Sequence, residues 1–421
     1  MSSLKNKVVL HLTSLSSGGG GTYTIDIHRT CVDLGYDSYV VVRGRKCIYP
    51  DGSIKEIHPS RHFYWDKLRR FLFRLVIKHS YVDDAYSMYN LCERFTCHSA
   101  KDILAALPKK PDVIFVHWVS DFANAKVIRD LESMTGAKVL FIMVDHALFS
   151  GGCHYQLDCQ RYKDGWHDCP ATTSRWVKRG IEKNYAFKKH YLPKDIHVAA
   201  RGIEKQRLSQ SELFRNCQQE LIVFPLDEKK FCPSSDKDAL RVKWGVPVDR
   251  KVVLIGATHL NEKRKGMDLL VEALKNVHND VLVLVAGNMD KQLAFVKEAK
   301  VLGYLSEGQL IEAYQMADLF VCPSLADAGP LMVMQSCFCG TPVVAFPVGV
   351  SAELVETGET GYLAQYGNVD DLAHGIDEIV MLPDERWKEI SLKCRERVLR
   401  LCSSQAGNTI DVFLNRIFDN E

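Results

Sequence analysis

The chain alternates short, nearly continuous apolar runs with segments of helical periodicity, and this alternation narrows the folds open to it. The first run, at 7–14, is followed by a glycine-rich segment at 16–21, a helical pattern over 22–36 and a second apolar run at 38–44. Strands that are apolar along their whole length are typical of parallel sheets covered by helices on both faces. The sequence therefore predicts an α/β fold with mostly parallel sheets.

The pattern occurs twice, which predicts two domains. In the first half, further apolar runs lie at 112–118 and 138–145. The alternation restarts at 250–258 and continues with runs at 280–287, 318–324 and 341–347. The segment 224–247 between the halves, with its prolines and mixed charge, is interpreted as a linker. A chain of 421 residues is also long for a single hydrophobic core.

Bulk composition excludes several classes of function. The formal net charge of +2 is too small to indicate a nucleic-acid partner. No apolar run reaches the roughly 18 residues needed to span a bilayer, and no secretory signal opens the chain. We therefore expect a cytoplasmic protein, or one that is peripheral on a membrane face, and expect most of its 14 cysteines to be reduced.

Ligands of open parallel sheets bind beyond the carboxyl ends of the strands, so the loops there are the candidate sites. The glycines at 18–21 could bring backbone amides close to a ligand or form a flexible turn, and they lack the G-x-G-x-x-G spacing of a dinucleotide site. Arg264 and Lys265 could neutralise a diphosphate or form a solvated pair. Asp327 and Gln335 are spaced so that both could face one ligand.

Several of these segments together resemble the family-4 retaining glycosyltransferases of GT-B fold. They are "HLTSLSSGGGG" at 11–21, "GATHLNEKRKG" at 256–266, "PSLADAGPLMVMQSCFCGTPVVAF" at 323–346 and "TGYL" at 360–363. Asp327 and Pro330 match a subgroup that builds bacterial surface and capsular polysaccharide of the colanic-acid type. The resemblance implies two Rossmann-like domains facing a cleft: an acceptor-side domain at 1–225, onto which 386–421 packs back, and a nucleotide-sugar donor domain at 226–385.

The resemblance also implies roles for individual residues. Catalysis would involve His117, Lys265 and Asp327. Departures from the family are Gln335, where a glutamate is usual, and Ala257-Thr258, where an arginine is frequent. No metal is expected to be required for catalysis. The donor-binding set would be Gly19, Gly20, Arg264, Lys265, Gly303, Tyr304, Asp327, Gly329, Leu331 and Gln335.

A cysteine-rich stretch at 145–170 resembles a segment of the same subgroup. Asp145, Gly151 and Gly152 would lie on the acceptor side. One reading is a structural zinc site, because three thiolates and an imidazole can complete a tetrahedral set. The other is a packed loop of reduced or partly disulfide-linked cysteines that shape the acceptor side without chemistry, since Trp166 replaces the fourth cysteine of the pattern. The zinc reading takes Cys153, Cys159, Cys169 and either His167 or His154.

The segment 61–80 predicts a basic amphipathic helix. Its apolar positions recur at helical spacing, and its lysines and arginines form a second face. It would either bind a membrane surface or pack its apolar face on the first domain with the basic face solvated. The apolar positions are Trp65, Leu68, Phe71, Leu72, Leu75 and Val76, and the basic ones are Lys67, Arg70, Arg74 and Lys78.

Taken together, these features predict a retaining, metal-independent transferase. It would move a hexose-type sugar from a nucleotide-sugar to a glycan or polyprenyl-linked glycan, in bacterial surface polysaccharide synthesis. Two alternatives stay open because of the departures at Gln335 and Ala257-Thr258. One is a catalytically impaired scaffold that binds nucleotide-sugar within an assembly complex, and the other is a sugar-nucleotide epimerase of the same fold.

Overall fold

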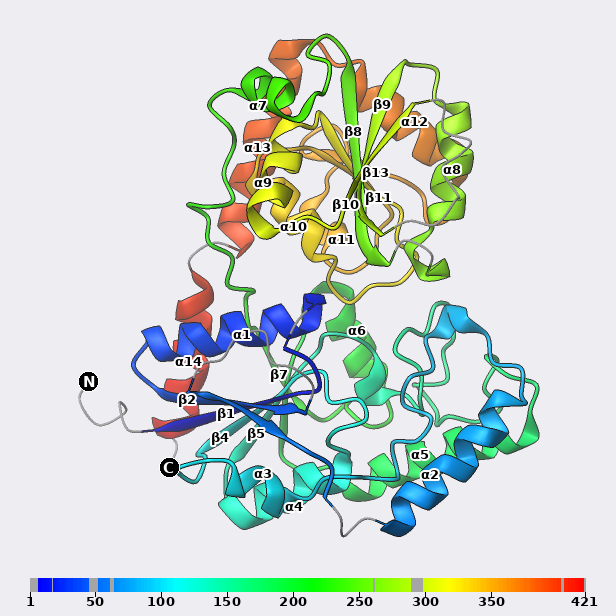
Figure 1. Cartoon of the computed structure of the whole chain (residues 1–421), viewed down its shortest axis with the longest axis vertical. Coiled ribbons are helices and arrows are strands. Elements are labelled where there is room, and N and C mark those ends of the chain that lie inside the picture. The colour runs from blue at the N-terminus through cyan, green and yellow to red at the C-terminus, as the bar shows by residue number, and fades with distance from the viewer. Residues whose placement is uncertain are drawn as a thin grey trace. The chain divides into compact units, whose positions relative to one another are not determined.

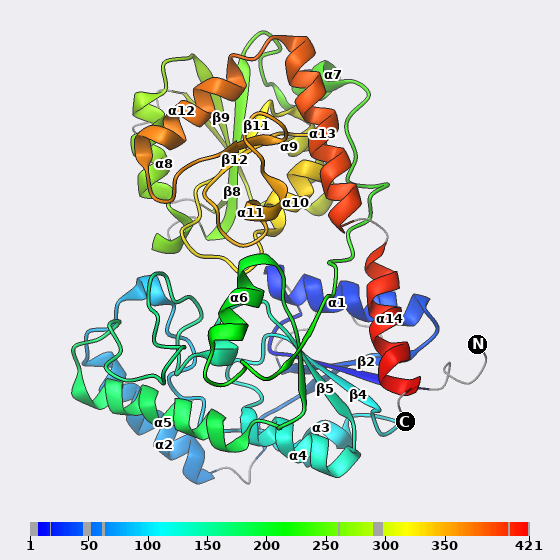
Figure 2. The ribbon, with the colours of Figure 1, turned by 180° about the vertical axis from the view of Figure 1, so that it is seen from behind.

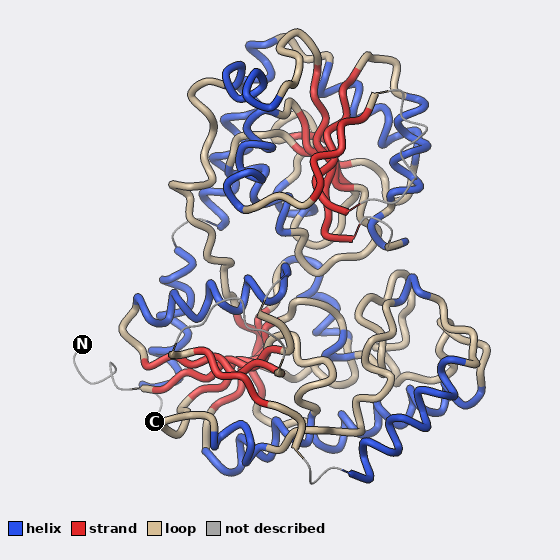
Figure 3. Tube along the Cα trace, viewed as in Figure 1, coloured by secondary structure: helices blue, strands red, loops and turns tan. Residues whose placement is uncertain are grey.

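The computed structural model describes residues 7–16, 18–44, 52–60, 64–259, 262–288, 298–402 and 405–419. The chain forms two compact units, Met1–Pro225 with Gln405–Glu421, and Leu226–Ser404. Each unit contains one parallel sheet covered by helices (Figure 3). The predicted α/β architecture with two sheets is therefore confirmed.

The first unit is built on a seven-stranded sheet in the order β3-β2-β1-β4-β5-β6-β7. Its strands are β1 (Val8–Thr13), β2 (Asp37–Arg43), β3 (Ile54–Ile57), β4 (Val113–Val116), β5 (Lys138–Ile142), β6 (Ile196–Ala199) and β7 (Gln218–Glu220). Its helices are α1 (Gly18–Asp33), α2 (Tyr64–Lys78), α3 (Ala100–Ala105), α4 (Ala125–Thr135), α5 (Arg175–Tyr191), α6 (Gly202–Gln210) and α14 (Gln405–Asp419), with short 3-10 turns η2 (Asp84–Tyr86) and η3 (Ala147–Phe149).

Alternation along the buried strands gives this sheet two cores. Leu10 and Ile114 point to the face covered by α3, α4 and α5, whereas Val9 and Phe115 point to the face covered by α1 and α14. Figure 1 shows α1 and α14 on one side of the sheet and α3 and α4 on the other. Every residue of β1 and β4 is buried, as expected for parallel strands with helices on both faces.

The last two helices belong to different units, which corrects the expectation that all of 386–421 packs on the first domain. Only α14 does so, because Ile410, Phe413 and Leu414 fill the core beside Phe115. The preceding helix, α13 (Asp384–Cys402), packs on the second unit, where Trp387 donates its indole N–H to the Asp318 carbonyl at 2.8 Å. Figure 2 shows both helices from behind.

The second unit has a six-stranded sheet in the order β10-β9-β8-β11-β12-β13. Its strands are β8 (Lys251–His259), β9 (Val281–Asn288), β10 (Ala299–Gly303), β11 (Leu319–Cys322), β12 (Val343–Ala345) and β13 (Gly361–Leu363). Its other helices are α7 (Lys237–Trp244), α8 (Met267–Asn276), α9 (Glu307–Met316), α10 (Leu331–Phe338), α11 (Ser351–Leu354) and α12 (Val369–Val380), with a 3-10 turn η4 (Lys263–Lys265).

The segment interpreted as a linker, 224–247, is shorter than predicted because α7 lies within it. Asp236 caps this helix, and its side chain accepts the Ala239 N–H. Arg241 of α7 is buried and pairs with Asp318 at 2.7 Å, which fixes α7 to the start of β11. The helix is therefore an integral part of the second unit.

Helix α2 forms as predicted over the described part of 61–80, but the expectation of a packed apolar face is wrong, and of the basic face Arg74 and Lys78 are exposed whereas Arg70 is not. Phe73 faces inward over Gly180 of α5, and Arg70 is buried against Asp121. The apolar face is exposed, Trp65 by 69% and Phe71 by 58%. Among the described residues, no helix is long and apolar enough to cross a membrane.

Candidate active site

In the second unit the chain reverses its direction of winding between β8 and β11, and the loops after these two strands are joined. The Leu325 N–H donates to the Arg264 carbonyl at 2.7 Å. Gly266 has φ +66°, and a side chain there would overlap the carbonyl oxygen of Pro323. Only glycine allows this close approach, which brings the basic residues of η4 to the carboxyl end of β11.

Four charged residues meet where these loops join, since Arg264 also pairs with Glu262 at 2.6 Å. The Lys265 ammonium lies 2.7 Å from Asp327 Oδ2, and the Arg264 guanidinium lies 3.4 Å from the same oxygen. The other Asp327 oxygen accepts the Gly329 N–H at 3.1 Å. Burial alone would raise the pKa of Asp327, but the charges of Lys265 and Arg264 outweigh it and the pKa lies below its usual value. The predicted cations and the predicted carboxylate are therefore brought together.

Gln335, in contrast, does not join this cluster through its side-chain oxygen. It lies on α10, is 8% exposed, and its Oε1 accepts the Tyr314 hydroxyl of α9 at 3.0 Å. Tyr314 is fully buried and its hydroxyl needs an acceptor, so Gln335 has a structural partner in this unit.

The remaining residues expected at the donor site in this unit lie at the ends of β10 and β11 and at the start of α10. Gly303 ends β10 with φ +71°, and Tyr304 after it is 70% exposed. Leu331 begins α10 and is partly exposed, and Gly329 precedes it in the loop after β11. All lie in strand-to-helix loops or at a helix start, where a sheet of this type binds ligands.

The glycines expected in a loop after β1 are helical instead. Gly18 to Gly21 form the first turn of α1. Gly19 and Gly20 have no close neighbour that a side chain would displace, other than the Trp118 Cβ at 3.9 Å from a Cβ on Gly20. The predicted ligand loop is therefore shorter than the sequence pattern indicated, and these two residues belong to the helix N-terminus.

The first unit contains a pocket at the carboxyl ends of β4 and β5, with about 530 Å³ of empty space that is partly open to solvent. The loop after β4 supplies His117 to Ser120. The loop after β5 supplies Met143 to Asp145 and Ala147 to Leu148. Its polar lining consists of Asn90, Glu93, His117, Trp118, Ser120, Asp145 and Lys188. Of the residues predicted from sequence, His117 and Asp145 line this pocket.

Two buried groups of this pocket have definite polar partners. Asp145 Oδ2 lies 2.5 Å from His154 Nδ1, and Asp145 Oδ1 accepts the Ala147 N–H at 2.8 Å. Burial would raise the pKa of Asp145, but His154 outweighs it and the pKa is lowered. The other ring nitrogen of His154 lies 3.1 Å from the Ser120 hydroxyl. The carboxylate is thus held in one orientation at the end of β5.

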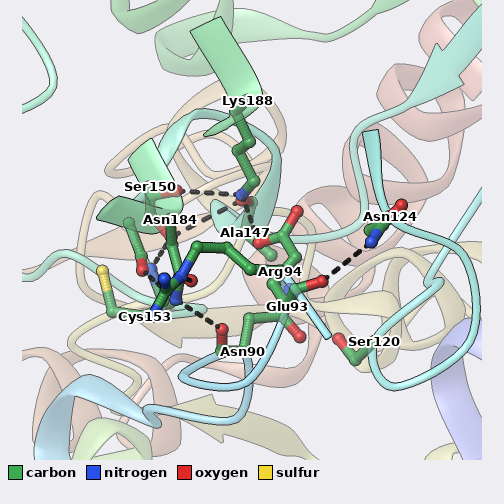
Figure 4. A network of polar contacts seen from close by, with 12 residues as sticks. Asn90, Glu93, Arg94, Ser120, Asn124, Ala147, Ser150, Cys153, Asn184 and Lys188 are labelled. Carbon is green, nitrogen blue, oxygen red and sulfur yellow. Dashed lines mark hydrogen bonds and ion pairs between the residues drawn. The ribbon is translucent and has the colours of Figure 1, made fainter. Parts of the chain in front are cut away.

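A buried ion pair that the sequence did not indicate lies beside it (Figure 4). Lys188 Nζ is 2.9 Å from Glu93 Oε2, and the two side chains are only 4% and 12% exposed. The ammonium also donates to the carbonyls of Ala147 and Ser150, at 2.9 Å for Ser150. The pair is 95 positions apart in the chain, so no sequence spacing could have revealed it.

The cysteine-rich stretch does not assemble the expected ligand set. Cys153 and Cys169 are buried, whereas His167 is exposed and His154 is engaged by Asp145. Over the described ranges, no group of three or more His, Cys, Asp or Glu side chains is placed to hold a metal ion. Cys153, Cys159 and Cys169 are free thiols. Packing therefore shapes this stretch.

The closest packing in this stretch is around Trp166, Gly151 and Gly152. Trp166 is 1% exposed and lies 6.1 Å from the Tyr185 ring of α5. A side chain at Gly151 would overlap Ile181 of α5, and one at Gly152 would press on Leu91. Both glycines are buried in this contact, whereas the prediction placed them on the cleft-facing acceptor side.

Comparison with known proteins gives matches of two kinds. Residues 236–394 match the family Glycosyl transferases group 1. Over 175 residues the chain is 30% identical to D-inositol 3-phosphate glycosyltransferase of Mycolicibacterium smegmatis, covering 38% of this chain and 39% of the relative. The chain thus spans less than half of the length of this curated relative.

The second kind is structural. Sucrose-phosphate synthase from Thermosynechococcus elongatus has a TM-score of 0.71 at 18% identity, covering 99% of this chain and 100% of that one. Anabaena HepE in complex with UDP and glucose has a TM-score of 0.64 at 16% identity, covering 97% and 100%. The predicted GT-B fold is confirmed, and the residues that match the group 1 glycosyltransferase family lie in the second unit.

We expect Lys188→Met to destabilise the protein by about 3–5 kcal/mol, because it leaves the Glu93 carboxylate buried without its counter-charge. Urea unfolding followed by circular dichroism measures this. The double variant Glu93→Leu/Lys188→Met should recover much of the loss, and Lys183→Met, at an exposed position of the same helix, should change little. A double variant no more stable than Lys188→Met would contradict the pairing.

Asp327→Asn should lower the free energy of unfolding by about 1.5–3 kcal/mol at pH 7, since Lys265 loses its anionic partner and Arg264 keeps only Glu262. The folded pKa of Asp327 is below its unfolded value, so this contribution is present above the unfolded pKa and is lost as pH falls through the folded one. The gap between wild type and variant should therefore narrow below about pH 4. Exposed Asp249→Asn serves as the control.

Proposed function

We propose that the chain transfers a hexose-type sugar from a nucleotide-sugar to a glycan or polyprenyl-linked glycan, with retention at the anomeric carbon. The setting we propose is bacterial surface polysaccharide synthesis at the cytoplasmic side. The observation that carries the proposal is the cluster of Lys265, Arg264 and Asp327 within the segment that matches group 1 glycosyltransferases. Two similar proteins support it: Anabaena HepE forms a complex with UDP and glucose, and the mycobacterial relative is a D-inositol 3-phosphate glycosyltransferase.

The charges at this cluster suit a diphosphate leaving group. Two cations side by side can offset the negative charge that develops on the departing phosphate oxygens, and such preorganised charges are a large part of catalysis. Asp327 keeps the Lys265 ammonium in place before a ligand arrives, at the cost of competing with phosphate for it. With two cations available, the transfer we propose needs no metal ion.

Lys265→Ala should reduce sugar transfer by about 10²- to 10³-fold through kcat, because it removes one of the charges that stabilise the leaving group. Transfer from a panel of nucleotide-sugars, with circular dichroism to verify folding, is the measurement. Lys263→Ala changes an exposed lysine of the same turn and should retain activity. Wild-type turnover by Lys265→Ala would refute the assigned role.

A non-catalytic scaffold is the second candidate, and the bond between Gln335 and Tyr314 favours it. This bond ties up the side-chain oxygen at a position where the resembled family uses a glutamate for the ribose. Calorimetric titration with nucleotide-sugars, run beside a transfer assay, separates the candidates: binding without transfer, or no binding at all, would support the scaffold. Turnover of the donor without any acceptor would instead support an epimerase.

The exposed face of α2 suits a membrane surface as the place of the acceptor. Seven large side chains of this helix are exposed, and cations of α2 and of the adjoining helix α5 flank them. Apolar side chains beside lysines and arginines bind anionic bilayers. The apolar set is Tyr64, Trp65, Leu68, Phe71, Leu72, Leu75 and Val76, and the exposed basic set is Arg69, Arg74, Lys78, Arg175, Arg179 and Lys183.

We expect the triple variant Trp65→Ser/Phe71→Ser/Leu75→Ser to bind vesicles of phosphatidylcholine with one third phosphatidylglycerol at least about tenfold more weakly than wild type, because each side chain loses its burial in the bilayer. Co-sedimentation measures this. Leu392→Ser, at an exposed position of α13, is the control. Equal sedimentation of the triple variant and wild type would rule out this face as the membrane contact.

A further inference from the structure

A chain of hydrogen bonds joins three histidines and two serines inside the first unit. His117 Nε2 lies 3.1 Å from His11 Nδ1, and His11 Nε2 lies 3.1 Å from the Ser38 hydroxyl. The same hydroxyl lies 2.7 Å from His28 Nδ1, and His28 Nε2 lies 2.9 Å from the Ser53 hydroxyl. These hydrogen bonds thus connect the pocket at the end of β4, across β1 and β2, with the turn before β3.

The rings nearest the pocket are enclosed by the fold. His11 on β1 is completely buried between α1 and the sheet, Ser38 on β2 is 4% exposed, and His117 is 5% exposed. Burial lowers the pKa of His11, and it lowers the pKa of His117 to about 3. Both rings are therefore neutral near pH 7, and each has one N–H and one lone pair.

Neutral rings allow only two proton arrangements between Ser38 and His117. If the Ser38 hydroxyl donates to His11 Nε2, His11 carries its proton on Nδ1 and donates it to His117 Nε2, so the His117 proton sits on Nδ1. If Ser38 accepts from His11 Nε2, every proton moves to the opposite nitrogen, and His117 Nδ1 is bare. Any mixed arrangement would place two lone pairs or two N–H groups face to face and lose a buried hydrogen bond.

The row of hydrogen bonds ends at the His117 ring, whose second nitrogen is Nδ1. This atom is buried, has no hydrogen-bond partner among the described residues, and belongs to a ring that lines the pocket. The proton arrangement along these hydrogen bonds would therefore affect a ligand through this atom. As a donor it would bind a ligand oxygen lone pair, and as an acceptor it would bind a hydroxyl proton.

We propose that His11 and Ser38 are positioning residues that hold His117 in a single tautomer, and so decide whether Nδ1 of this pocket-lining ring donates to or accepts from a sugar hydroxyl. Ser38 is the branch point, because its one hydroxyl proton can serve only one of the two histidines beside it. The ligand class rests on the proposed function. The single tautomer rests only on the hydrogen bonds of the first unit.

The test is the tautomeric state of His117 in the full-length protein. Two-bond 15N–1H correlation spectra of histidine-labelled protein distinguish the two neutral tautomers, and His117→Gln assigns the resonance. Wild type should show one neutral tautomer at pH 7. Ser38→Ala should shift these resonances to the other tautomer or to an average. Two controls should leave them unchanged: Ser38→Thr, which keeps the hydroxyl, and Ser211→Ala, at a buried serine that is not part of these hydrogen bonds.

An averaged or charged His117 in wild type would overturn the proposal, and so would an unchanged His117 in Ser38→Ala. Sugar transfer gives a second, separate readout. Ser38→Ala should lower kcat by about twofold to tenfold, the effect of one misdirected neutral hydrogen bond, with little change in KM. Absence of transfer by wild type would defeat the proposed function and leave the spectroscopic outcome to decide the tautomer.

Discussion

Burial of both faces of the two parallel sheets is the constraint on which the remaining structure depends. Strands such as β1 and β4 have no exposed residue, so the side chains that can meet a ligand are confined to the strand ends. In a parallel sheet the carboxyl ends lie at one edge, and loops from strands far apart in sequence meet there. Both candidate sites, the cluster around Asp327 and the pocket around His117, are at such edges.

The charges gathered at these edges are compensated within each unit. Asp327 is matched by Lys265 and Arg264, and Glu93 is matched by Lys188. A buried charge without a partner costs several kcal/mol, so each of these arrangements must form as a set. The two sets differ in composition. The Lys188 ammonium is bound by Glu93 and two carbonyls, whereas Lys265 and Arg264 share the Asp327 carboxylate and Arg264 also pairs with Glu262 at 2.6 Å.

In two regions the choice of buried side chains differs from what the sequence predicted. Helix α2 exposes Trp65 and Phe71 and buries Arg70, because Asp121 beneath it provides a carboxylate that an apolar face could not satisfy. The cysteine-rich stretch is organised around the buried ring of Trp166, which contacts Tyr185. In both regions one buried partner from a distant segment decides which side chains face outward.

The sequence by itself determined the α/β class, the two sheets and the residues Lys265 and Asp327, because continuous apolar runs and strand-end motifs are local properties. Only the tertiary structure decided which face of α2 points outward and that Gln335 bonds Tyr314. It also decided that Glu93 pairs with Lys188 and that hydrogen bonds connect His117 to Ser38. These features depend on contacts between residues far apart in the chain, and the physical reason is that hydrogen bonds and ion pairs require positions in space, which no spacing along one strand or helix specifies.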